Sequence, residues 1–207
     1  MKPTNSSDEE RWIAGAQHGD ADAFESLMHL HEKQIYGLCL RLCGNSEDAR
    51  EAAQETFLSA WQGLPAFRGD ASFPTWLYRL ASNACMDLLR REKRSRGAAG
   101  PSLDDTLVNF EIPDPTPGPQ EHAEQDELHQ AVLNGLAALS PEHREVLILR
   151  EIHQLSYDEI SEVLDLDEGT VKSRINRARK HLRAFLIRSG NFFTTVPSKR
   201  TEKEGRK

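Results

Sequence analysis

Basic side chains recur along one predicted helix near the C-terminus, at a spacing that places them on a single face. This helix begins at about Thr170, and its apolar residues follow at spacings of four, three and four: Val171, Ile175, Ala178 and Leu182. The other face is basic or polar: Lys172, Ser173, Arg174, Asn176, Arg177, Arg179 and Lys180. Guanidinium and ammonium groups bind phosphate oxygens and base edges. The pattern therefore predicts a helix that packs through one side and contacts DNA through the other.

A shorter helix is predicted immediately before the basic one. Ser156 to Glu159 fits a capping box, in which a hydroxyl and a carboxylate bond the first free amides of a helix. Ile160, Val163 and Leu164 give this helix an apolar face, and Asp165 to Gly169 is expected to form a short turn. Two short helices joined by a tight turn, the second of them basic, are typical of a helix-turn-helix.

Charge is divided unevenly along the chain. The net charge is −7, which taken alone disfavours binding to DNA. Residues 170–207, however, contain 12 Lys/Arg against 2 Asp/Glu, and residues 76–96 contain 6 against 2. Residues 97–127 contain 8 Asp/Glu and no Lys or Arg. Local potential governs phosphate contact, so two nucleic-acid surfaces are expected, although a solvated charged face is the common alternative for any single cluster.

Residues from Asp22 to about Arg94 read as almost entirely helical, and one of these helices has an acidic and aromatic surface. Gly44-Asn45 breaks the pattern, and Ser46 is expected to cap the next helix. That helix carries three carboxylates at spacings of three and four, an amide and two aromatic rings: Asp48, Glu51, Glu55, Gln54, Phe57 and Trp61. Such a surface suits basic side chains on a partner helix. Alternatively, the carboxylates complement the helix dipole and the rings belong to the core.

The loop at residues 67–72 and the helix after it combine aromatic with basic side chains. The helix is expected to start near Phe73-Pro74, where a proline is tolerated in the first turn, and to run through Arg91. Aromatic platforms and basic grooves hold the unstacked bases of a single strand. Leu77 and Leu80 are interpreted as core residues, while for Trp76 core packing and base contact stay equally open.

The helical pattern stops after Gly97. Prolines then alternate near the end of an acidic, weakly periodic stretch: Pro113, Pro115, Pro117 and Pro119. Such a segment cannot bury enough apolar surface to order itself, so it is interpreted as a linker. Helices resume at about Glu121, and Ser140-Pro141 marks a further helix start.

The expected architecture is therefore all-α. Two helical domains, at residues 12–96 and 128–188, are joined by a flexible acidic Pro-rich linker at 97–127. Residues 189–207 are expected to form a disordered basic tail.

Other classes of protein find little support in the sequence. No run approaches the roughly 20 apolar residues of a membrane span, and Met1 to Glu10 lacks a signal-peptide pattern, so a cytoplasmic chain without membrane insertion is expected. No phosphate loop or nucleophile motif indicates an enzyme, and no cofactor is expected. Cys39 and Cys43 lie four residues apart, not far from His29 and His31, but core packing is favoured over a metal site.

Four blocks of this sequence together resemble the extracytoplasmic-function (ECF) group of bacterial sigma-70 factors. The blocks are Gly19–Phe24, Asp48–Trp61, Phe67–Asp87 and Leu139–Leu182, in the order and spacing of the family. The resemblance implies a transcription initiation factor whose sigma2-like domain binds core RNA polymerase and reads and melts the −10 element. It further implies a sigma4-like helix-turn-helix that reads the −35 element.

The resemblance also implies partners and site residues. The partners are promoter DNA, the clamp coiled coil of the largest polymerase subunit, the flap of the second-largest subunit, and an anti-sigma factor. Polymerase binding is assigned to Asp48, Glu51, Gln54, Glu55, Phe57, Leu58 and Trp61. The −10 element is assigned to Phe67, Arg68, Asp70, Ser72, Phe73, Trp76, Arg79, Asn83, Asp87, Arg90 and Arg91. The −35 element is assigned to Ser156, Glu168, Gly169, Thr170, Lys172, Ser173, Arg174, Arg177, Arg179 and Lys180.

One serious alternative is an autonomous helix-turn-helix regulator with an N-terminal sensor or dimerisation domain. Such a protein would bind specific duplex DNA without polymerase. The blocks at 48–61 and 67–87 argue against it, because a sensor domain has no need of both.

Overall fold

The computed structural model describes residues 6–99 and 130–189, which contain helices and no β-strand. The first part comprises α1 (Ser6–Gln17), α2 (Ala21–Cys43), α3 (Ser46–Gly63), the short 3₁₀ helix η1 (Leu64–Ala66) and α4 (Phe73–Ala99). The second comprises a helical stretch at 130–137, α6 (Pro141–Leu147), the π-helical segment η2 (Ile148–Ile152), α7 (Tyr157–Leu164) and α8 (Glu168–Ser189). The all-α prediction is confirmed. Most of the predicted linker and of the tail lies outside the described residues.

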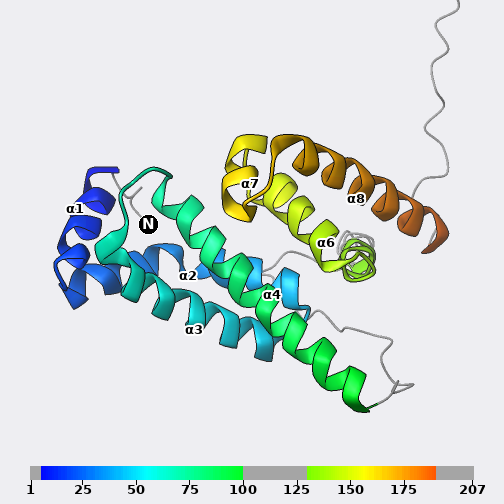
Figure 1. Cartoon of the computed structure of the whole chain (residues 1–207), viewed down its shortest axis with the longest axis horizontal. Helices are drawn as coiled ribbons and strands as arrows, with labels where there is room; N and C mark the ends of the chain where they lie inside the picture. Colours follow the sequence, from blue (N-terminus) through cyan, green and yellow to red (C-terminus); the bar gives the residue numbers. More distant parts are fainter. Residues whose placement is uncertain (1–5, 100–129, 190–207) are drawn as a thin grey trace, which may run out of the picture.

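Helices α2, α3 and α4 form the body of the first part, and α1 lies at one end of it (Figure 1). The buried face of α3 consists of small residues: Ala49, Ala52, Thr56 and Ala60. Small side chains let α3 pack closely against α2 and α4. The larger side chains of α3 are consequently left at its outer surface.

The ends of α2 and α3 are fixed by local hydrogen bonds. Asp20 Oδ1 accepts from the amides of Asp22 and Ala23 at 3.0 and 3.2 Å, and Gly44, with φ 87°, closes α2 in the left-handed conformation. The prediction that Ser46 caps α3 is wrong by one residue. Asn45 has the extended backbone of a cap, and its Oδ1 accepts from the Asp48 amide at 2.9 Å.

Two helices differ from the prediction. The sequence pattern does not predict α1, since this helix contributes only a few apolar side chains, such as Trp12 and Ile13, to the core. Helix α4 continues past Arg91 to Ala99, three residues into the predicted linker. Its last turns are rich in Arg, Lys, Glu and Ala, which favour helix strongly enough to tolerate Gly97 at a cost of about 1 kcal/mol.

The helix-turn-helix is present, with one boundary shifted. The predicted capping box is confirmed: Ser156 Oγ accepts from the Glu159 amide at 3.1 Å, and the Ser156 amide donates to Glu159 Oε2 at 2.7 Å. Helix α8 starts at Glu168, not at about Thr170. The reason is Asp167, whose Oδ1 accepts from the Thr170 amide at 2.8 Å and so caps the helix two residues earlier.

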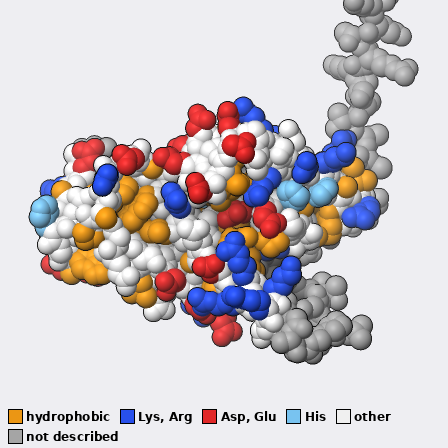
Figure 2. Space-filling model, in the orientation of Figure 1, with side chains coloured by type: hydrophobic (Ala, Val, Ile, Leu, Met, Phe, Trp, Pro, Cys, Tyr) orange, Lys and Arg blue, Asp and Glu red, His pale blue; other side chains and the backbone are white. Residues whose placement is uncertain are grey.

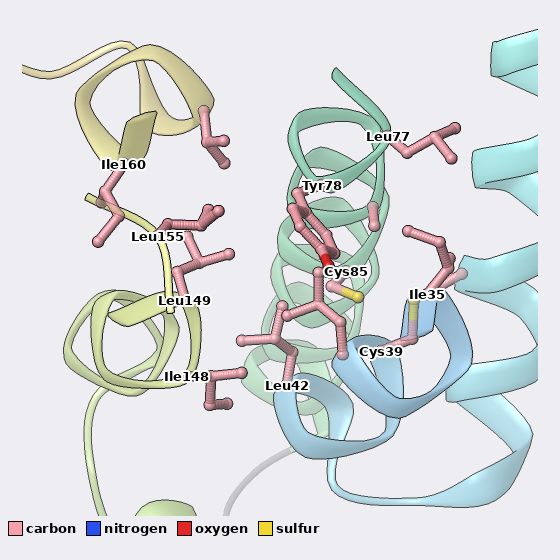
Figure 3. Packing of buried hydrophobic residues seen from close by; sticks show 14 of the residues in the cluster. Ile35, Cys39, Leu42, Leu77, Tyr78, Cys85, Ile148, Leu149, Leu155 and Ile160 are labelled. Atoms are coloured by element: carbon pink, nitrogen blue, oxygen red, sulfur yellow. The ribbon is translucent and has the colours of Figure 1, made fainter. Parts of the chain in front are cut away.

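The second part packs directly against α2 and α4 of the first (Figures 1 and 3). In Figure 3, Leu149 and Leu155 point toward the helix that carries Tyr78, and Ile148 lies toward Leu42. These five side chains are all buried. A polar contact lies beside them, because His153 Nδ1 is 3.1 Å from the Tyr78 hydroxyl.

Arg144 of α6 joins the two parts through backbone carbonyls. Its Nη1 donates to Leu42 O at 2.6 Å, its Nε to Leu136 O at 3.0 Å and its Nη2 to Ala137 O at 2.8 Å. These carbonyls lie at the C-terminal ends of α2 and of the helix at 130–137. The free carbonyls and negative dipole of a helix end attract a cation, so one buried guanidinium satisfies two helix ends at once.

The three cysteines are free and buried in the core, which confirms the packing predicted for Cys39 and Cys43. Contacts from the thiols of Cys39 and Cys43, together with burial, raise the pKa of Cys85, which therefore stays a protonated and unreactive thiol. Within residues 6–99 and 130–189, no three His, Cys, Asp or Glu side chains gather where they could hold a metal ion. No helix in those ranges is long and apolar enough to cross a membrane.

Glu145 of α6 is a titratable group buried between the parts, with 5 % of its surface exposed. Burial raises its pKa to about 7, which keeps the carboxyl largely protonated below neutrality. Ser82 of α4, whose hydroxyl is otherwise unpartnered in the described chain, favours the ionised form. Arg174 of α8 and Arg90 of α4 act in the same direction more weakly, and Glu142 opposes them.

We expect the free energy of unfolding to fall as the pH rises from about 4.5 to about 7. In this window the carboxyl of Glu145 ionises in the unfolded chain but stays protonated in the folded one, so the folded state binds more protons. Above the window the full loss is on the order of 3 kcal/mol at most. Urea denaturation between pH 4 and 8 should show a flatter profile for Glu145→Gln. The exposed neighbour Glu142 provides the control: its charge contributes less to the raised pKa of Glu145 than burial does, so Glu142→Gln should keep most of the wild-type slope. Equal slopes for Glu145→Gln and wild type would contradict the assignment.

Candidate nucleic-acid and protein interfaces

The exposed face of α8 carries the basic residues that the sequence assigns to DNA. Lys and Arg side chains gather along this helix, at the right of Figure 2. Among the predicted −35 residues on α8, several are exposed: Glu168, Gly169, Lys172, Arg177, Arg179 and Lys180. Three are half-buried: Thr170, Ser173 and Arg174. The opposite face is buried at Val171, Ile175 and Ala178, which confirms the predicted packing side.

Some of these groups already have partners in the folded chain. Lys172 Nζ lies 2.6 Å from Glu168 Oε1, and Arg179 Nε donates to Glu151 Oε1 at 2.9 Å. Hydrogen bonds to these carboxylates raise the pKa of Lys172 and of Arg179. Lys172 and Arg179 must exchange a carboxylate for a phosphate to bind DNA.

Arg177 and Lys180 have no ion pair within the described residues, and both are exposed. Among the predicted −35 residues of α8, they are therefore the cations most ready to bind phosphate or a base edge. Ser156, although exposed, already uses its hydroxyl to cap α7.

Three aromatic rings meet where the predicted −10 loop joins α4. The ring centroids of Phe67 and Trp76 are 4.9 Å apart, and Phe73 lies 5.8 Å from Phe67 and 5.7 Å from Trp76. Phe73 is buried, whereas Phe67 and Trp76 are half-buried. Phe73 thus supports the other two rings from the core side, and Trp76 both packs and keeps part of its surface open.

A cavity of about 230 Å³ opens beside these rings, and we call it the −10 cavity. Its lining includes five predicted −10 residues: Phe67, Arg68, Asp70, Trp76 and Arg79. Its volume is below the roughly 300–1,000 Å³ of drug-sized sites, so it suits a single base or side chain. Glu162 and Val163 of α7 also line it, which the sequence did not predict.

The loop over this cavity is tied down at both ends. Gln17 of α1 donates from Nε2 to Phe67 O at 2.8 Å, an anchor that sequence reasoning missed because it did not predict α1. At the other end, Ser72 Oγ accepts from the Thr75 amide at 3.2 Å and pairs with the Thr75 hydroxyl at 2.7 Å. Gly69, with φ 77°, makes the turn between them.

The remaining −10 candidates extend along the exposed side of α4. Asn83, Asp87, Arg90 and Arg91 are all exposed. Arg90 Nη1 lies 3.0 Å from Asp87 Oδ1, an ion pair that partly neutralises the charge of Arg90. Arg91 Nη1 lies 3.9 Å from Glu51 Oε1 on α3, so the predicted −10 and polymerase groups adjoin one another.

Helix α3 presents the predicted polymerase surface beside an apolar cavity. Glu51, Gln54 and Glu55 are exposed, while Asp48 is half-buried and accepts from Asn45 Nδ2 at 2.6 Å. The cavity, of about 380 Å³, is lined by Phe24, Met28, Gln54, Phe57, Leu58 and Trp61. Leu58 is 49 % exposed. The rings of Phe24 and Trp61 lie 5.0 Å apart at this edge, so these aromatics are not solely core residues.

Phe24 and Met28 belong to this surface although the sequence placed them in an apolar stripe of the core. Both side chains are half-buried. Their apolar spacing on α2 cannot distinguish a core position from a position at the edge of a docking surface.

A second apolar groove lies on the other part of the chain, and the sequence did not predict it. Its volume is about 330 Å³, and most of its lining is aliphatic: Val132, Leu136, Leu147, Ile148, Ile152, Leu182 and Leu186. Glu151, Arg179 and Arg183 complete the lining, and Ile152 is 42 % exposed. An exposed aliphatic groove with a charged edge is typical of a site for an amphipathic helix.

Two family profiles match separate parts of the chain. Sigma-70 region 2 matches residues 27–95, and Sigma-70 region 4 matches residues 129–182. The first match contains all of α3 and the residues of the −10 cavity that come from the loop and α4, and the second contains most of α8. The matches cover three of the four blocks that carry the resemblance in sequence, and the block Gly19–Phe24 lies before the first match.

Curated relatives match along most of the chain. The ECF RNA polymerase sigma factor SigW of Bacillus subtilis (strain 168) is 33 % identical over 83 % of this chain and 92 % of its own length. The RNA polymerase sigma-H factor of Pseudomonas aeruginosa is 34 % identical over 83 % of this chain and 90 % of its own. The ECF RNA polymerase sigma-E factor of Escherichia coli (strain K12) is 35 % identical over 81 % and 88 %.

Solved structures share the fold. CnrH, solved in complex with the cytosolic domain of CnrY, is 26 % identical, with a TM-score of 0.63 over 88 % of this chain and 99 % of that one. The sigma factor RpoE of Bartonella quintana, solved with the anti-sigma factor NepR, is 22 % identical, with a TM-score of 0.63 over 81 % and 98 %.

The Gln17 anchor makes a local prediction. Gln17→Leu removes one hydrogen bond to Phe67 O, worth about 1 kcal/mol, so amide exchange in residues 67–72 should accelerate by roughly five-fold. Hydrogen-exchange mass spectrometry measures this directly. Gln62→Leu is the control, since Gln62 is exposed and has no hydrogen bond in the described chain. Equal protection of the loop in both variants would show that Gln17 does not hold it.

Proposed function

This chain belongs to the ECF group of the sigma-70 family, and from that premise we propose how its surfaces divide the work of promoter recognition. Members of the family are transcription initiation factors and not enzymes. The helix-turn-helix therefore serves initiation by polymerase, and the alternative of an autonomous regulator loses its support. The proposal rests on one observation: a single chain combines an exposed acidic and aromatic helix, an aromatic and basic cavity, and a basic recognition helix.

The surface on α3 is proposed to bind the clamp coiled coil of the largest polymerase subunit. Glu51 and Glu55 supply exposed carboxylates for basic partner side chains, and Gln54 lies between them and the apolar cavity. Leu58 and Phe57 provide apolar area that a partner helix would cover. The combination of charge for orientation and apolar area for affinity is that of a protein interface.

The −10 cavity is proposed to receive a base from the opened non-template strand. Phe67 and Trp76 offer aromatic surface for stacking, and Arg68 and Arg79 bring positive charge to the same cavity. Asn83, Arg90 and Arg91 continue a polar and basic track along α4 for the neighbouring backbone. Extruding a base from its stack is the strategy of proteins that read bases one at a time.

Helix α8 is proposed to enter the major groove of the −35 element. Its exposed N-terminal residues Glu168 and Gly169 come first, and Arg177 and Lys180 lie further along the same helix. Arg174, half-buried and near Glu145, is better placed to fix the helix than to reach far into the groove.

Two protein partners complete the proposal. The aliphatic groove between the 130–137 helix, η2 and α8 would take an amphipathic segment of the polymerase flap. An anti-sigma factor is the second expected partner. CnrH has been solved with the cytosolic domain of CnrY, and the Bartonella quintana sigma factor with its anti-sigma factor, which supports a comparable partner for this chain.

Run-off transcription tests the function as a whole. Purified chain and bacterial core polymerase are combined with a library of upstream sequences, and the initiated transcripts are sequenced. We expect polymerase-dependent initiation at a shared two-element promoter. Absence of initiation together with tight duplex binding by the chain alone would instead establish the autonomous regulator.

Charge reversal on α3 should separate polymerase binding from folding. Glu55→Lys places a cation on the proposed polymerase surface and should abolish binding to core polymerase, without changing the thermal unfolding temperature by more than a few degrees. Asp22→Lys makes the same reversal at an exposed site that does not line the α3 cavity, and it should bind normally. Affinity for core polymerase is measured by biolayer interferometry. Normal binding by Glu55→Lys would remove α3 from the interface.

Truncation on α8 should affect the −35 element alone. Arg177→Ala removes an exposed guanidinium that has no ion pair within the described residues, at an expected cost of about 1–3 kcal/mol in binding the −35 duplex. Arg188→Ala removes another exposed charge, from the last turn of the same helix, and should cost far less. Run-off assays on promoters with intact or scrambled −35 elements read out the difference. Undiminished, promoter-selective transcription by Arg177→Ala would leave that residue as a solvated charge only.

A further inference from the structure

Helix α1 has no part in the proposed interfaces, although it lies against the segment that forms the −10 cavity. It sits at one end of the first part (Figure 1) and packs against η1, which leads into the loop at 67–72. Near its end, Gln17 donates to Phe67 O at 2.8 Å. In its first turn, Glu9 contacts His31 of α2. The two ends of α1 are thus fixed to different supports of the same cavity.

The contact between Glu9 and His31 is a buried one on the histidine side. His31 is 5 % exposed, and its Nε2 lies 2.9 Å from Glu9 Oε1. A carboxylate accepts hydrogen bonds, so the Nε2–H of His31 is the donor. A buried N–H without an acceptor is costly, and Glu9 therefore favours one orientation of the His31 ring.

The His31 ring in turn supports the aromatic rings of the cavity. Its centroid lies 5.5 Å from that of Phe73, at an interplanar angle of 55°. Phe73 lies 5.8 Å from Phe67 and 5.7 Å from Trp76. Packed interiors transmit displacements from one side chain to the next. A continuous path therefore leads from Glu9 through His31 to the rings that face the cavity.

Trp76 has a separate support on α3. Its ring lies so close to Gly63 that a Cβ there would be 3.1 Å from Trp76 Cζ2. Trp76 therefore packs on the end of α3, whereas Phe67 and Phe73 are held through α1 and His31. Two supports thus set the distance of 4.9 Å between the rings of Phe67 and Trp76. A change in α1 alters this distance while the support of Trp76 on α3 remains.

We propose that α1 positions the aromatic rings of the −10 cavity for a promoter base, through Glu9 at one end and Gln17 at the other. This inference rests on the proposed function of the cavity. Within the described chain, the lining of the cavity includes no residue of α1. Helix α1 therefore acts through Phe67 and Phe73 and not by contact with DNA.

Positioning separates the binding of a base from the binding of the strand's backbone. Stacking depends on how the rings are placed, whereas the attraction of phosphate to Arg68 and Arg79 falls off slowly with distance. A change in α1 should therefore weaken the contact with the captured base and leave phosphate binding nearly unchanged. A strand that lacks this base shows the difference.

Fluorescence anisotropy of holoenzyme, assembled from the full-length chain and bacterial core polymerase, tests the proposal. The probes are labelled single strands with the non-template −10 sequence recovered by run-off selection. One strand is intact, and each of the others has an abasic site at one position. In wild type, the abasic site that weakens binding most identifies the captured base. We define base discrimination as the dissociation constant of that abasic strand divided by that of the intact strand.

Glu9→Leu should lower base discrimination roughly five-fold, the equivalent of one hydrogen bond, by weakening binding of the intact strand alone. Glu9→Gln keeps an oxygen that accepts from His31 and should retain the wild-type value. Glu25→Leu is the matched control. It breaks an exposed pair on α2, in which Glu25 Oε1 lies 3.5 Å from His29 Nε2, and should leave base discrimination unchanged.

A second variant acts at the other end of α1. Gln17→Leu should also lower base discrimination, whereas Gln62→Leu should not. Because Gln17 is only half-buried, this variant tests the proposal even if Glu9→Leu fails to fold. Both α1 variants should bind core polymerase and a −35 duplex as wild type does. Wild-type discrimination in Gln17→Leu or in folded Glu9→Leu, or equal weakening of intact and abasic strands, would overturn the positioning role.

The wild-type measurement separates this inference from the function on which it rests. If no abasic site weakens binding by wild-type holoenzyme, the cavity receives no base, and the proposed function of the cavity fails together with the inference. If wild type discriminates and the α1 variants discriminate equally well, only the positioning role fails.

Discussion

The arrangement of this chain depends on one buried cation. Arg144 is 9 % exposed, and its guanidinium donates to carbonyls at the ends of two helices that belong to different parts of the protein. An unpaired buried charge would cost several kcal/mol, so the side chain is stable there only while both helix ends are within reach. If the parts separate, Arg144 loses Leu42 O but keeps Leu136 O and Ala137 O, and water can replace the one lost partner. The same residue thus joins the two parts through Leu42 O and, through Leu136 O and Ala137 O, also ties α6 to the helix at 130–137 within the second part.

Three polar side chains serve both the folding of a helix and the placement of a recognition surface. Ser72, Ser156 and Asp167 each cap a helix that carries predicted recognition residues, so these side chains fix where the recognition surface begins. On α3 the small buried residues determine which apolar side chains lie at the surface. Because Ala49, Ala52 and Ala60 occupy the core side, Phe57, Leu58 and Trp61 are left toward the surface. Local requirements of folding therefore decide which side chains are available to partners.

Patterns within one helix were predictable from the sequence, whereas relations between distant elements were not. The capping box at Ser156, the buried face of α8 and the all-helical fold follow from spacing alone. The hydrogen bond from Gln17 to Phe67 O and the position of Glu162 in the lining of the −10 cavity each bring together residues that lie far apart in the sequence. Neither produces a pattern that can be recognised within one helix. The predicted helix starts were wrong where a neighbouring polar residue caps the helix: Asn45 caps α3, and Asp167 caps α8. Phe24 was interpreted as core because apolar periodicity does not distinguish a buried site from the edge of a docking surface.

The length of chain between the parts permits both close packing and wide separation. Residues 100–129 could reach ~100 Å if fully extended, at about 3.3 Å per residue, and promoter elements about 25 bp apart lie ~85 Å from each other at 3.4 Å per step. Contacts between tethered parts benefit from an effective concentration in the millimolar range, so a partner must supply enough binding energy to displace them. The α3 cavity and the aliphatic groove both keep exposed apolar residues, Leu58 and Ile152, while the parts are packed together. A protein partner can therefore cover either apolar site while the parts stay packed together, and separating the parts requires further binding energy.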